Sequence, residues 1–353
     1  MCISIKVFPA ANGDCFLIGI KDDIGIKHIL IDGGKGELCH SKLKDQFEWL
    51  EKHNLCIDLL VVTHIDDDHI GGILKLFQDK EINNSIINKV WFNSGTLISS
   101  KLGGNLNRDL SIISESHSKE MSVRQGLTFE GLLEKTNIWD KNLIYSGQKF
   151  NLDSVNLIIL SPDNDTLNEL NRKWDSEIEK MKKKNKKKRK MASSTDYHKT
   201  IDELCFEEFE EDTSLFNKSS IAFILEYQDS KLLMLGDSHP STIVSSLKNL
   251  GYSEENKLKV NIMKISHHAS KKNTSDELLQ LIECEKFIIS SDGSKHGLPN
   301  KQSLARIVRK MKKPVTFYFN YSSMDGIFTP QECKDENITS IYLDNTNDYT
   351  TRC

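Results

Sequence analysis

Short apolar runs rich in β-branched residues recur along this chain, and several of them stop abruptly at aspartate, histidine or glycine. Examples are HILID, DLLVVTH, KLLMLGD, VNIMKISHH and KFIISSDG. Runs of this length are typical of buried strands, and apolar spacings of three to four residues between them predict helices. Hairpin-like strand pairs in the first half, and alternating strand and helix in the second, favour two sheets covered by helices, an α/β sandwich.

The composition is that of a globular protein: of 353 residues, 38% are hydrophobic and 28% are charged. The formal net charge of −4 gives no overall attraction to nucleic acid, so any polyanion site must be local. No stretch approaches the roughly 20 apolar residues of a membrane helix, and the N-terminus lacks a signal-peptide pattern. The eight cysteines are scattered without a Cys-x-x-Cys pair. We therefore expect a cytoplasmic protein without membrane contact.

Two segments interrupt the alternation of strands and helices, at about residues 94–140 and 163–217. We interpret them as insertions in a single domain spanning 1–353, with residues 314–353 forming a C-terminal strand and tail. The second insertion contains the basic run EIEKMKKKNKKKRK and then the acidic stretch IDELCFEEFEED. Either these blocks neutralise each other in a solvated helical insertion, or the basic run is an arm that contacts phosphate backbones.

The candidate nucleic-acid contacts of that arm are its basic side chains: Lys182, Lys183, Lys184, Lys186, Lys187, Lys188, Arg189 and Lys190. No aromatic residues are interleaved with them, so the run does not indicate a platform on which single-stranded bases stack.

The densest cluster of polar side chains is THIDDDHIGG, residues 63–72, which follows an apolar strand and precedes a helical pattern. In an extended segment alternate side chains point the same way, so His64, Asp66 and Asp68 are expected to converge. His69 is then expected to point elsewhere and to serve a second ion. The aspartates also interact favourably with the positive end of the following helix.

A calcium loop and a plain helix cap both fit this cluster less well than a metal site of the imidazole–carboxylate kind. A calcium-binding EF-hand loop starting at Asp66 fails, because Ile70 occupies a ligand position and Phe77 replaces the bidentate glutamate. An aspartate-rich helix cap with unrelated histidines is the plain alternative. Two histidines interleaved with aspartates are unusual in such a cap, so the cluster favours a metal site.

Further carboxylates and imidazoles end other predicted strands, namely Asp32, Asp237, His267, His268, Asp292 and His296. Each alone is ordinary as a turn residue, but together they favour one shared site. A set limited to carboxylate and imidazole ligands indicates zinc, manganese or iron. Two such ions activate water and stabilise charge on a phosphoryl or acyl oxygen. No serine-hydrolase elbow, phosphate-binding glycine loop or Rossmann signature competes with this interpretation.

THIDDDHIGG resembles the His-x-His-x-Asp-His signature of the metallo-β-lactamase fold, with Asp66 in place of the second histidine. That replacement is similar to the branch containing the hydrolase domain of the competence channel ComEC and its soluble relatives. The order of the motifs also matches: ANGDCFLI and ILIDGG precede THIDDDHIGG, and KLLMLGD, KISHHAS and SDGSKHGLP come after it. The resemblance covers about residues 1–92 and 217–310, and it leaves the two insertions and the C-terminal tail unmatched.

The resemblance implies a four-layer αββα sandwich with a site for two divalent ions, zinc or manganese, at one edge. It assigns His64 and Asp66 to one ion, Asp68 and His69 to the other, and Asp237 to the position between them. Asp68 is also the candidate that orients the attacking water.

The same resemblance assigns His267 as a further ligand, with His268 next to the substrate or ligating in its place. It places Asp14 and Asp32 behind the ligands as supporting carboxylates. Relatives often carry a histidine where this chain has Leu298, so His296 is the candidate substitute.

The function that these features favour is a phosphodiesterase or nuclease acting on nucleic acid or a nucleotide. The family adds an association with bacterial anti-phage defence and with partner proteins encoded in the same operon. One alternative is a hydrolase of a small molecule such as a cyclic nucleotide, lactone or thioester, because loops choose the substrate on this fold. The other is a binding or regulatory subunit with weak or no catalysis, which Leu298 and the insertions would support.

Overall fold

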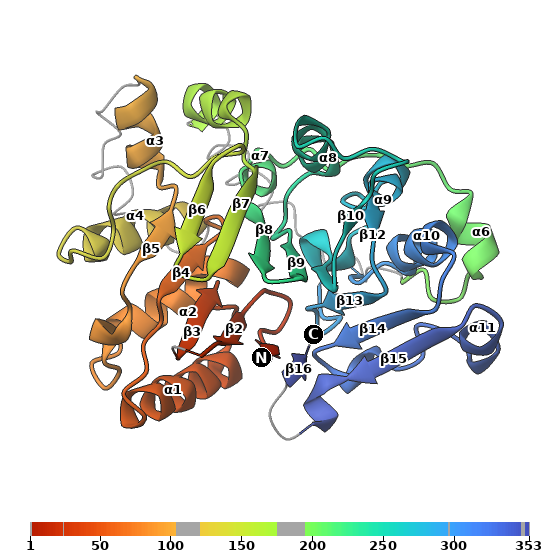
Figure 1. Cartoon of the computed structure of the whole chain (residues 1–353), viewed down its shortest axis with the longest axis horizontal. Coiled ribbons are helices and arrows are strands. Elements are labelled where there is room, and N and C mark those ends of the chain that lie inside the picture. Colours follow the sequence, from red (N-terminus) through yellow and green to blue (C-terminus); the bar gives the residue numbers. More distant parts are fainter. Residues whose placement is uncertain are drawn as a thin grey trace.

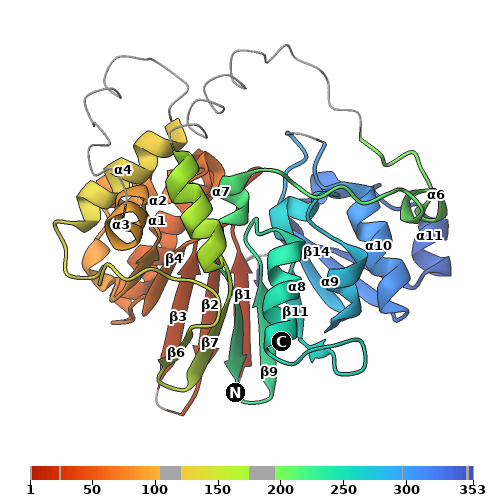
Figure 2. The same ribbon diagram turned by 90° about the horizontal axis from the view of Figure 1, so that it is seen from above.

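The computed structural model describes residues 2–23, 25–103, 121–174, 195–295, 297–346 and 350–352. Two large sheets pack face to face, and helices cover their outer surfaces (Figure 1). In Figure 2, α1–α4 lie on one side of the two sheets and α8–α10 on the other. The αββα sandwich predicted from the strand and helix pattern is therefore confirmed.

The first sheet has six strands in the order β16-β1-β2-β3-β4-β5. Their bounds are β1 (Cys2–Val7), β2 (Phe16–Lys21), β3 (Ile26–Ile31), β4 (Leu59–Val62), β5 (Val90–Phe92) and β16 (Thr350–Arg352). Strands β1–β3 are antiparallel, β3–β5 are parallel, and β16 pairs antiparallel with β1. The first and last strands of the chain are thus neighbours.

The second sheet has eight strands in the order β15-β14-β13-β11-β9-β8-β7-β6. Their bounds are β6 (Lys149–Leu152), β7 (Val155–Ser161), β8 (Ala222–Tyr227), β9 (Ser230–Met234), β11 (Ile262–Lys264), β13 (Lys286–Ile289), β14 (Val315–Phe319) and β15 (Ile338–Tyr342). The short strands β10 (Leu258–Lys259) and β12 (Ile282–Glu283) pair separately. Because β14, β15 and β16 all follow residue 313, the predicted single C-terminal strand and tail is too simple.

Alternation of side chains along the strands produces the four layers. In β4, Leu59 and Val61 enter the core between the sheets, whereas Leu60 and Val62 pack under the helices. A strand with apolar residues on both faces must be covered on both sides, because each exposed face would leave apolar surface in water. The second sheet follows the same rule at β9.

The helices that cover the first sheet are α1 (Glu37–Lys52), α2 (Asp67–Gln78), α3 (Gly95–Leu102) and α4 (Met121–Leu133). Those that cover the second are α8 (Pro240–Asn249), α9 (Asp276–Gln280) and α10 (Lys301–Met311). The helices α6 (Ile201–Cys205), α7 (Leu215–Lys218) and α11 (Pro330–Asp335) are short, and residues 164–174 are also helical. In the described part of the chain, no helix combines the length and apolar character needed to cross a bilayer.

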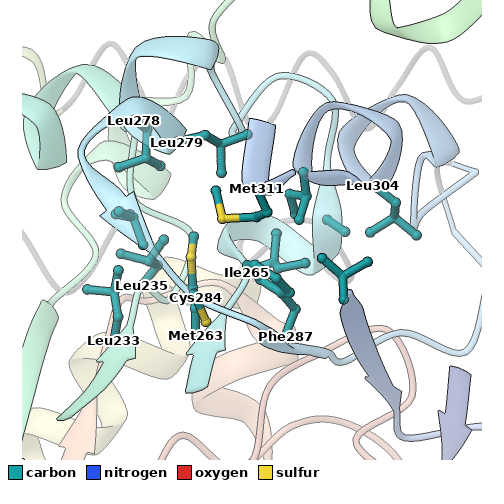
Figure 3. Close-up of a cluster of buried hydrophobic side chains, with 14 of the residues drawn as sticks. Leu233, Leu235, Met263, Ile265, Leu278, Leu279, Cys284, Phe287, Leu304 and Met311 are labelled. Atoms are coloured by element: carbon teal, nitrogen blue, oxygen red, sulfur yellow. The ribbon is translucent and has the colours of Figure 1, made fainter. Parts of the chain in front are cut away.

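The core beneath α9 and α10 joins helices to strands of the second sheet (Figure 3). Leu233, Met263 and Phe287 come from β9, β11 and β13, and they share this cluster with Leu278 of α9 and Leu304 of α10. This packing fixes the carboxyl ends of β9 and β11, which deliver the polar residues described next. Ligand sites of sheets with parallel strands lie at such ends.

Candidate metal centre

Four imidazoles, two of them adjacent in the sequence, face one carboxylate oxygen. The Oδ2 atom of Asp237 lies 3.4 Å from Nε2 of His69, 3.7 Å from that of His268, 3.8 Å from that of His267 and 3.9 Å from that of His64. These separations exceed the range of a strong hydrogen bond. Two ligands each about 2.1 Å from one tetrahedral ion are about 3.4 Å apart, so the spacing suits ligands of a shared cation.

The atoms that point into this cluster are buried and have no hydrogen-bond partner among the described residues. They include Nε2 of His64, His69 and His268 and Oδ1 of Asp237. A buried polar atom without a partner costs about 1–3 kcal/mol, and a bound cation would satisfy several at once. The residues present therefore fit a divalent metal.

Three sets of side chains place ligand atoms within 4.8 Å of one another, and all their members are buried. They are His64 with His69 and Asp237; Asp14 with Asp237 and His268; and Asp14 with Asp32 and His69. The sets share residues, so they form one connected centre.

The far side of each buried ring is held by a group that accepts or shares a proton. Asp32 Oδ2 lies 2.8 Å from Nδ1 of His69, and the carbonyl oxygen of Ser290 lies 2.9 Å from Nδ1 of His268. Asp32 is fixed in turn by the backbone N–H of Thr63, which donates to Oδ1 at 2.8 Å. A ring that donates from Nδ1 keeps its Nε2 lone pair for a metal.

Close backbone contact seats α2 against the loop after β3. A Cβ on Gly72 would lie 1.9 Å from the carbonyl oxygen of Gly33, so any residue larger than glycine at position 72 would clash with the loop after β3. The N–H of Gly33 donates to the carbonyl oxygen of His69 at 2.9 Å. This contact brings Asp32 to the ring of His69.

The charges of the centre are strongly coupled. Burial alone would raise the pKa of Asp237, but His69, His268 and His267 lower it by more than burial raises it. The pKa of Asp237 therefore lies well below its ordinary value. Burial lowers the pKa of His69, yet Asp237 and Asp32 raise it well above the usual range. The carboxylate of Asp237 and the ring of His69 thus stabilise each other's charged forms, so metal binding at this centre competes with protons.

Asp66 and Asp68 lie at the start of α2, and their geometry differs from the expected alternation. Helix α2 begins at Asp67, so Asp68 and His69 are helical rather than extended. His69 turns toward His64, with ring centroids 4.2 Å apart, and does not point elsewhere. Asp68 instead accepts a hydrogen bond from the side chain of Asn12.

Asp66 is the N-cap of α2, and its Oδ2 lies 3.7 Å from Nε2 of His64. Its Oδ1 is buried without a partner in the described structure. It is therefore near enough to join His64, although it belongs to none of the three sets of closely spaced ligand atoms. Asp68 likewise belongs to none of them.

A buried lysine contributes to the centre, although the sequence motifs did not point to it. Lys264, at the end of β11, is 1% exposed and forms an ion pair with Asp14. Its Nζ also donates to the carbonyl oxygen of Gly236 at 2.8 Å and lies 3.8 Å from Oδ1 of Asp237. Burial raises the pKa of Asp14, but Lys264 and His268 outweigh it and lower the pKa. A lone lysine inside the apolar run VNIMKIS was the available signal.

The turn that carries the two adjacent histidines has an unusual backbone. His267, His268 and Ala269 all have positive φ, at 47°, 53° and 63°. Such left-handed conformations favour glycine, whereas this chain has alanine at position 269. The turn separates the two rings, whose centroids are 5.8 Å apart with planes at 70°.

Asp212 and Asn273 flank His267, His239 lies near Asp212, and the sequence motifs did not point to any of the three. Asp212 lies in the acidic stretch of the second insertion, where local charge alone predicted only a solvated surface. Its Oδ2 lies 3.5 Å from both Nδ1 of His267 and Nε2 of His239. His296 and the basic run 182–190 lie outside the described residues, and Leu298, next to the former, is buried.

Comparison with family models gives no match, and comparison with curated proteins gives none either. Among solved structures, the metallo-β-lactamase fold protein YhfI from Bacillus subtilis shares 10% identity over 100% of both chains, with a TM-score of 0.43. A putative metal-dependent hydrolase from Parabacteroides distasonis shares 10% identity over 86% of this chain and 88% of its own, with a TM-score of 0.37.

CmlA, a diiron β-hydroxylase from Streptomyces venezuelae, shares 10% identity over 99% of this chain and 54% of its own, with a TM-score of 0.40. At these values the overlap is distant, and the assignment of layers rests on the strand order and core clusters described above. The chain is therefore a mixed α/β protein with an αββα sandwich, and one edge of that sandwich gathers imidazoles and carboxylates able to hold divalent metal.

Proposed function

We propose that this protein is a metal-dependent phosphodiesterase that hydrolyses nucleic acid with two divalent ions, zinc or manganese. The observation that carries the proposal is the convergence of four imidazole Nε2 atoms on Oδ2 of Asp237. The resemblance of the motifs to the ComEC hydrolase domain supports a phosphodiester as the substrate. A cytoplasmic location, a role in anti-phage defence and a partner from the same operon belong to the same proposal.

The residues that would hold the ions are those whose unpartnered atoms face the cluster, together with their immediate neighbours: His64, Asp66, His69, Asp237, His267 and His268. When bound, divalent ions supply an acidified water and positive charge at the reacting ester. Carboxylate and imidazole donors suit zinc and manganese.

The supporting residues have separate tasks. Asp32 and the Ser290 carbonyl hold the rings of His69 and His268 so that each Nε2 faces inward. Lys264 balances the charge of Asp14 behind the centre. These contacts lie in the buried interior, so they keep the ligands in place before substrate arrives, and no reorganisation is needed during the reaction.

Asp68 is half-buried at the start of α2, where Asn12 donates to its carboxylate. We assign Asp68 to orienting the attacking water, with Asn12 holding the carboxylate at the entrance to the centre. Asp68 is more exposed than the buried Asp237, so a bound substrate can approach its carboxylate.

The decisive experiment compares wild type with His64→Ala and the control His53→Ala. His53 is exposed and stacks on Trp49 away from the centre. Metal content is measured by inductively coupled plasma mass spectrometry, and cleavage is measured on plasmid, single-stranded DNA, RNA and cyclic nucleotides. We expect wild type and His53→Ala to hold metal and cleave nucleic acid, and His64→Ala to lose both.

Two different outcomes would be equally informative. Activity on cyclic or mononucleotide esters alone would replace the nuclease by a small-molecule hydrolase. Less than one bound transition metal per chain in carefully prepared wild type, together with no dependence of activity on His64, would overturn the enzymatic proposal.

A further inference from the structure

The Nδ1 atom of His267 lies in a small polar enclosure. Oδ1 of Asn273 is 2.9 Å away, Oδ2 of Asp212 is 3.5 Å away, and the side-chain nitrogen of Asn217 is 3.4 Å away. Asn273 and Asn217 are buried. The enclosure is therefore built largely from interior side chains, although His267 itself remains 26% exposed.

The neighbours of this enclosure determine which ring nitrogen carries the proton. The side-chain nitrogen of Asn273 donates to the backbone oxygen of Asp237 at 3.3 Å, which directs its Oδ1 toward His267. The side-chain nitrogen of Asn217 donates to Asp212 at 2.7 Å. His267 Nδ1 thus faces two acceptor oxygens, so it is the donor, and Nε2 retains its lone pair toward the metal centre.

Asp212 reaches this position through the acidic strap, which we define as residues 206–214. The strap contacts the helices that cover the second sheet and the loop after β11. Arg306 lies over the ring of Phe209 at 5.2 Å, and Glu211 accepts from the backbone and hydroxyl of Ser241 at 2.8 and 3.0 Å. The N–H of Asp212 donates to the carbonyl oxygen of Lys272 at 3.1 Å.

Both oxygens of Asp212 are engaged. Oδ1 accepts from the N–H of Ser214 at 3.1 Å, and Oδ2 faces Asn217, His239 and His267. Burial raises the pKa of Asp212, but the two histidines and Asn217 outweigh it, and the pKa lies well below its ordinary value. Asp212 therefore places its carboxylate behind the ring of His267.

We propose that Asp212 is a positioning residue for the metal centre, through which the second insertion orients His267 and strengthens it as a ligand. A carboxylate behind a ligating imidazole fixes the ring and raises its basicity, and losing such a partner typically weakens metal binding by about 10–100-fold. The inference rests on the proposed function, because it requires that His267 binds metal. On this inference, the acidic part of the second insertion supports a metal ligand and is not only a solvated surface.

The test compares Asp212→Asn with Glu211→Gln, a matched change from carboxylate to amide one residue away. Affinity for Zn²⁺ and Mn²⁺ is measured by chelator competition, and ligand geometry by the visible spectrum of the Co²⁺-substituted protein. We expect Asp212→Asn to weaken binding by about 10–100-fold and to shift the Co²⁺ spectrum. Glu211→Gln should leave both unchanged.

A double-mutant cycle separates positioning from a general loss of structure. In a His267→Gln background, Asp212→Asn should have no further effect on affinity if Asp212 acts through His267. An equal effect in both backgrounds, or wild-type affinity in Asp212→Asn, would overturn the inference. Retention of metal by His64→Ala would instead overturn the proposed function, so the two failures are distinguishable.

Discussion

His267 and His268 are consecutive in the chain and share a left-handed turn, yet they are supported by different parts of the protein. His268 is buried and held by a backbone carbonyl after β13, with Asp14 from the loop after β1 at 3.3 Å. His267 is partly exposed and held by side chains, one of which is Asp212 from the second insertion. One imidazole depends on the body of the sandwich, and its neighbour depends on a segment added to it.

The largest effect is expected on the buried side of this comparison. Asp14→Ala removes the closest partner of the buried Lys264 ammonium and leaves only Asp237, 3.8 Å away, which should cost about 3–5 kcal/mol of the free energy of unfolding. The measurement is denaturant unfolding of the chelator-treated protein. Asp212→Ala should cost less, because the carboxylate of Asp212 is 14% exposed and the ring of His267, which it leaves behind, is 26% exposed.

Combining Asp14→Ala with Lys264→Met provides the control, because removing both charges avoids a buried ammonium that has lost its closest partner. The double variant should recover part of the lost stability. Equal unfolding free energies for Asp14→Ala and Asp212→Ala would contradict the distinction between the two sides.

A smaller effect, dependent on pH, is expected on the exposed side. Burial lowers the pKa of His267, but Asp237 and Asp212 raise it more, from 6.5 to about 9. Because the folded value lies above the unfolded one, the stabilisation is complete below about pH 6.5 and is lost as the pH rises through 9. In the metal-free protein, this group should contribute a slope of up to about 1.4 kcal/mol per pH unit between these limits.

The measurement is the unfolding free energy of chelator-treated wild type and His267→Gln from pH 6 to pH 10. In His267→Gln, the decrease of the unfolding free energy with pH should be smaller by the contribution of this one titrating group. Metal binding has the opposite dependence, since a ligating imidazole must be neutral, so affinity should rise with pH. An identical slope in both proteins would show that His267 is not the titrating group.

The smallest effect concerns the turn that both histidines share. Ala269 has a φ of 63°, which costs an L-residue about 1–2 kcal/mol, while its buried methyl contributes about 0.8 kcal/mol. Ala269→Gly should therefore raise the unfolding free energy by up to about 1 kcal/mol. Ala11→Gly, at another left-handed but less buried position, is the matched comparison and should stabilise at least as much. Destabilisation by Ala269→Gly alone would show that packing outweighs strain in this turn.

The layers and the strand-end residues follow from local sequence patterns. Alternating apolar residues such as those of β4 predict a strand covered on both faces, and parallel strands such as β9 and β11 end at one edge of their sheet. That is why Asp237, His267 and His268 could be grouped from the sequence although Asp237 lies far from THIDDDHIGG. Grouping these three residues requires only the positions at which the predicted strands end.

The features that the sequence did not predict depend on contacts that local patterns do not contain. The alternation rule fails after Asp66 because this aspartate caps α2, so the next residues follow helical rather than extended spacing. Asp212 occurs among other acidic residues, and its sequence context resembles that of Glu211. Only the path of the strap directs Asp212 toward His267 and Glu211 toward Ser241. Lys264 belongs to an apolar strand, and its partner Asp14 lies 250 positions earlier in the sequence.

The pairing of β16 with β1 has a consequence for synthesis. Thr350–Arg352 pair with one edge of β1, so that edge of the first sheet stays uncovered until residues 350–352 have been synthesised, more than 300 residues after β1. An uncovered edge strand is a template for pairing with other chains, which leaves the nascent chain open to aggregation over that interval.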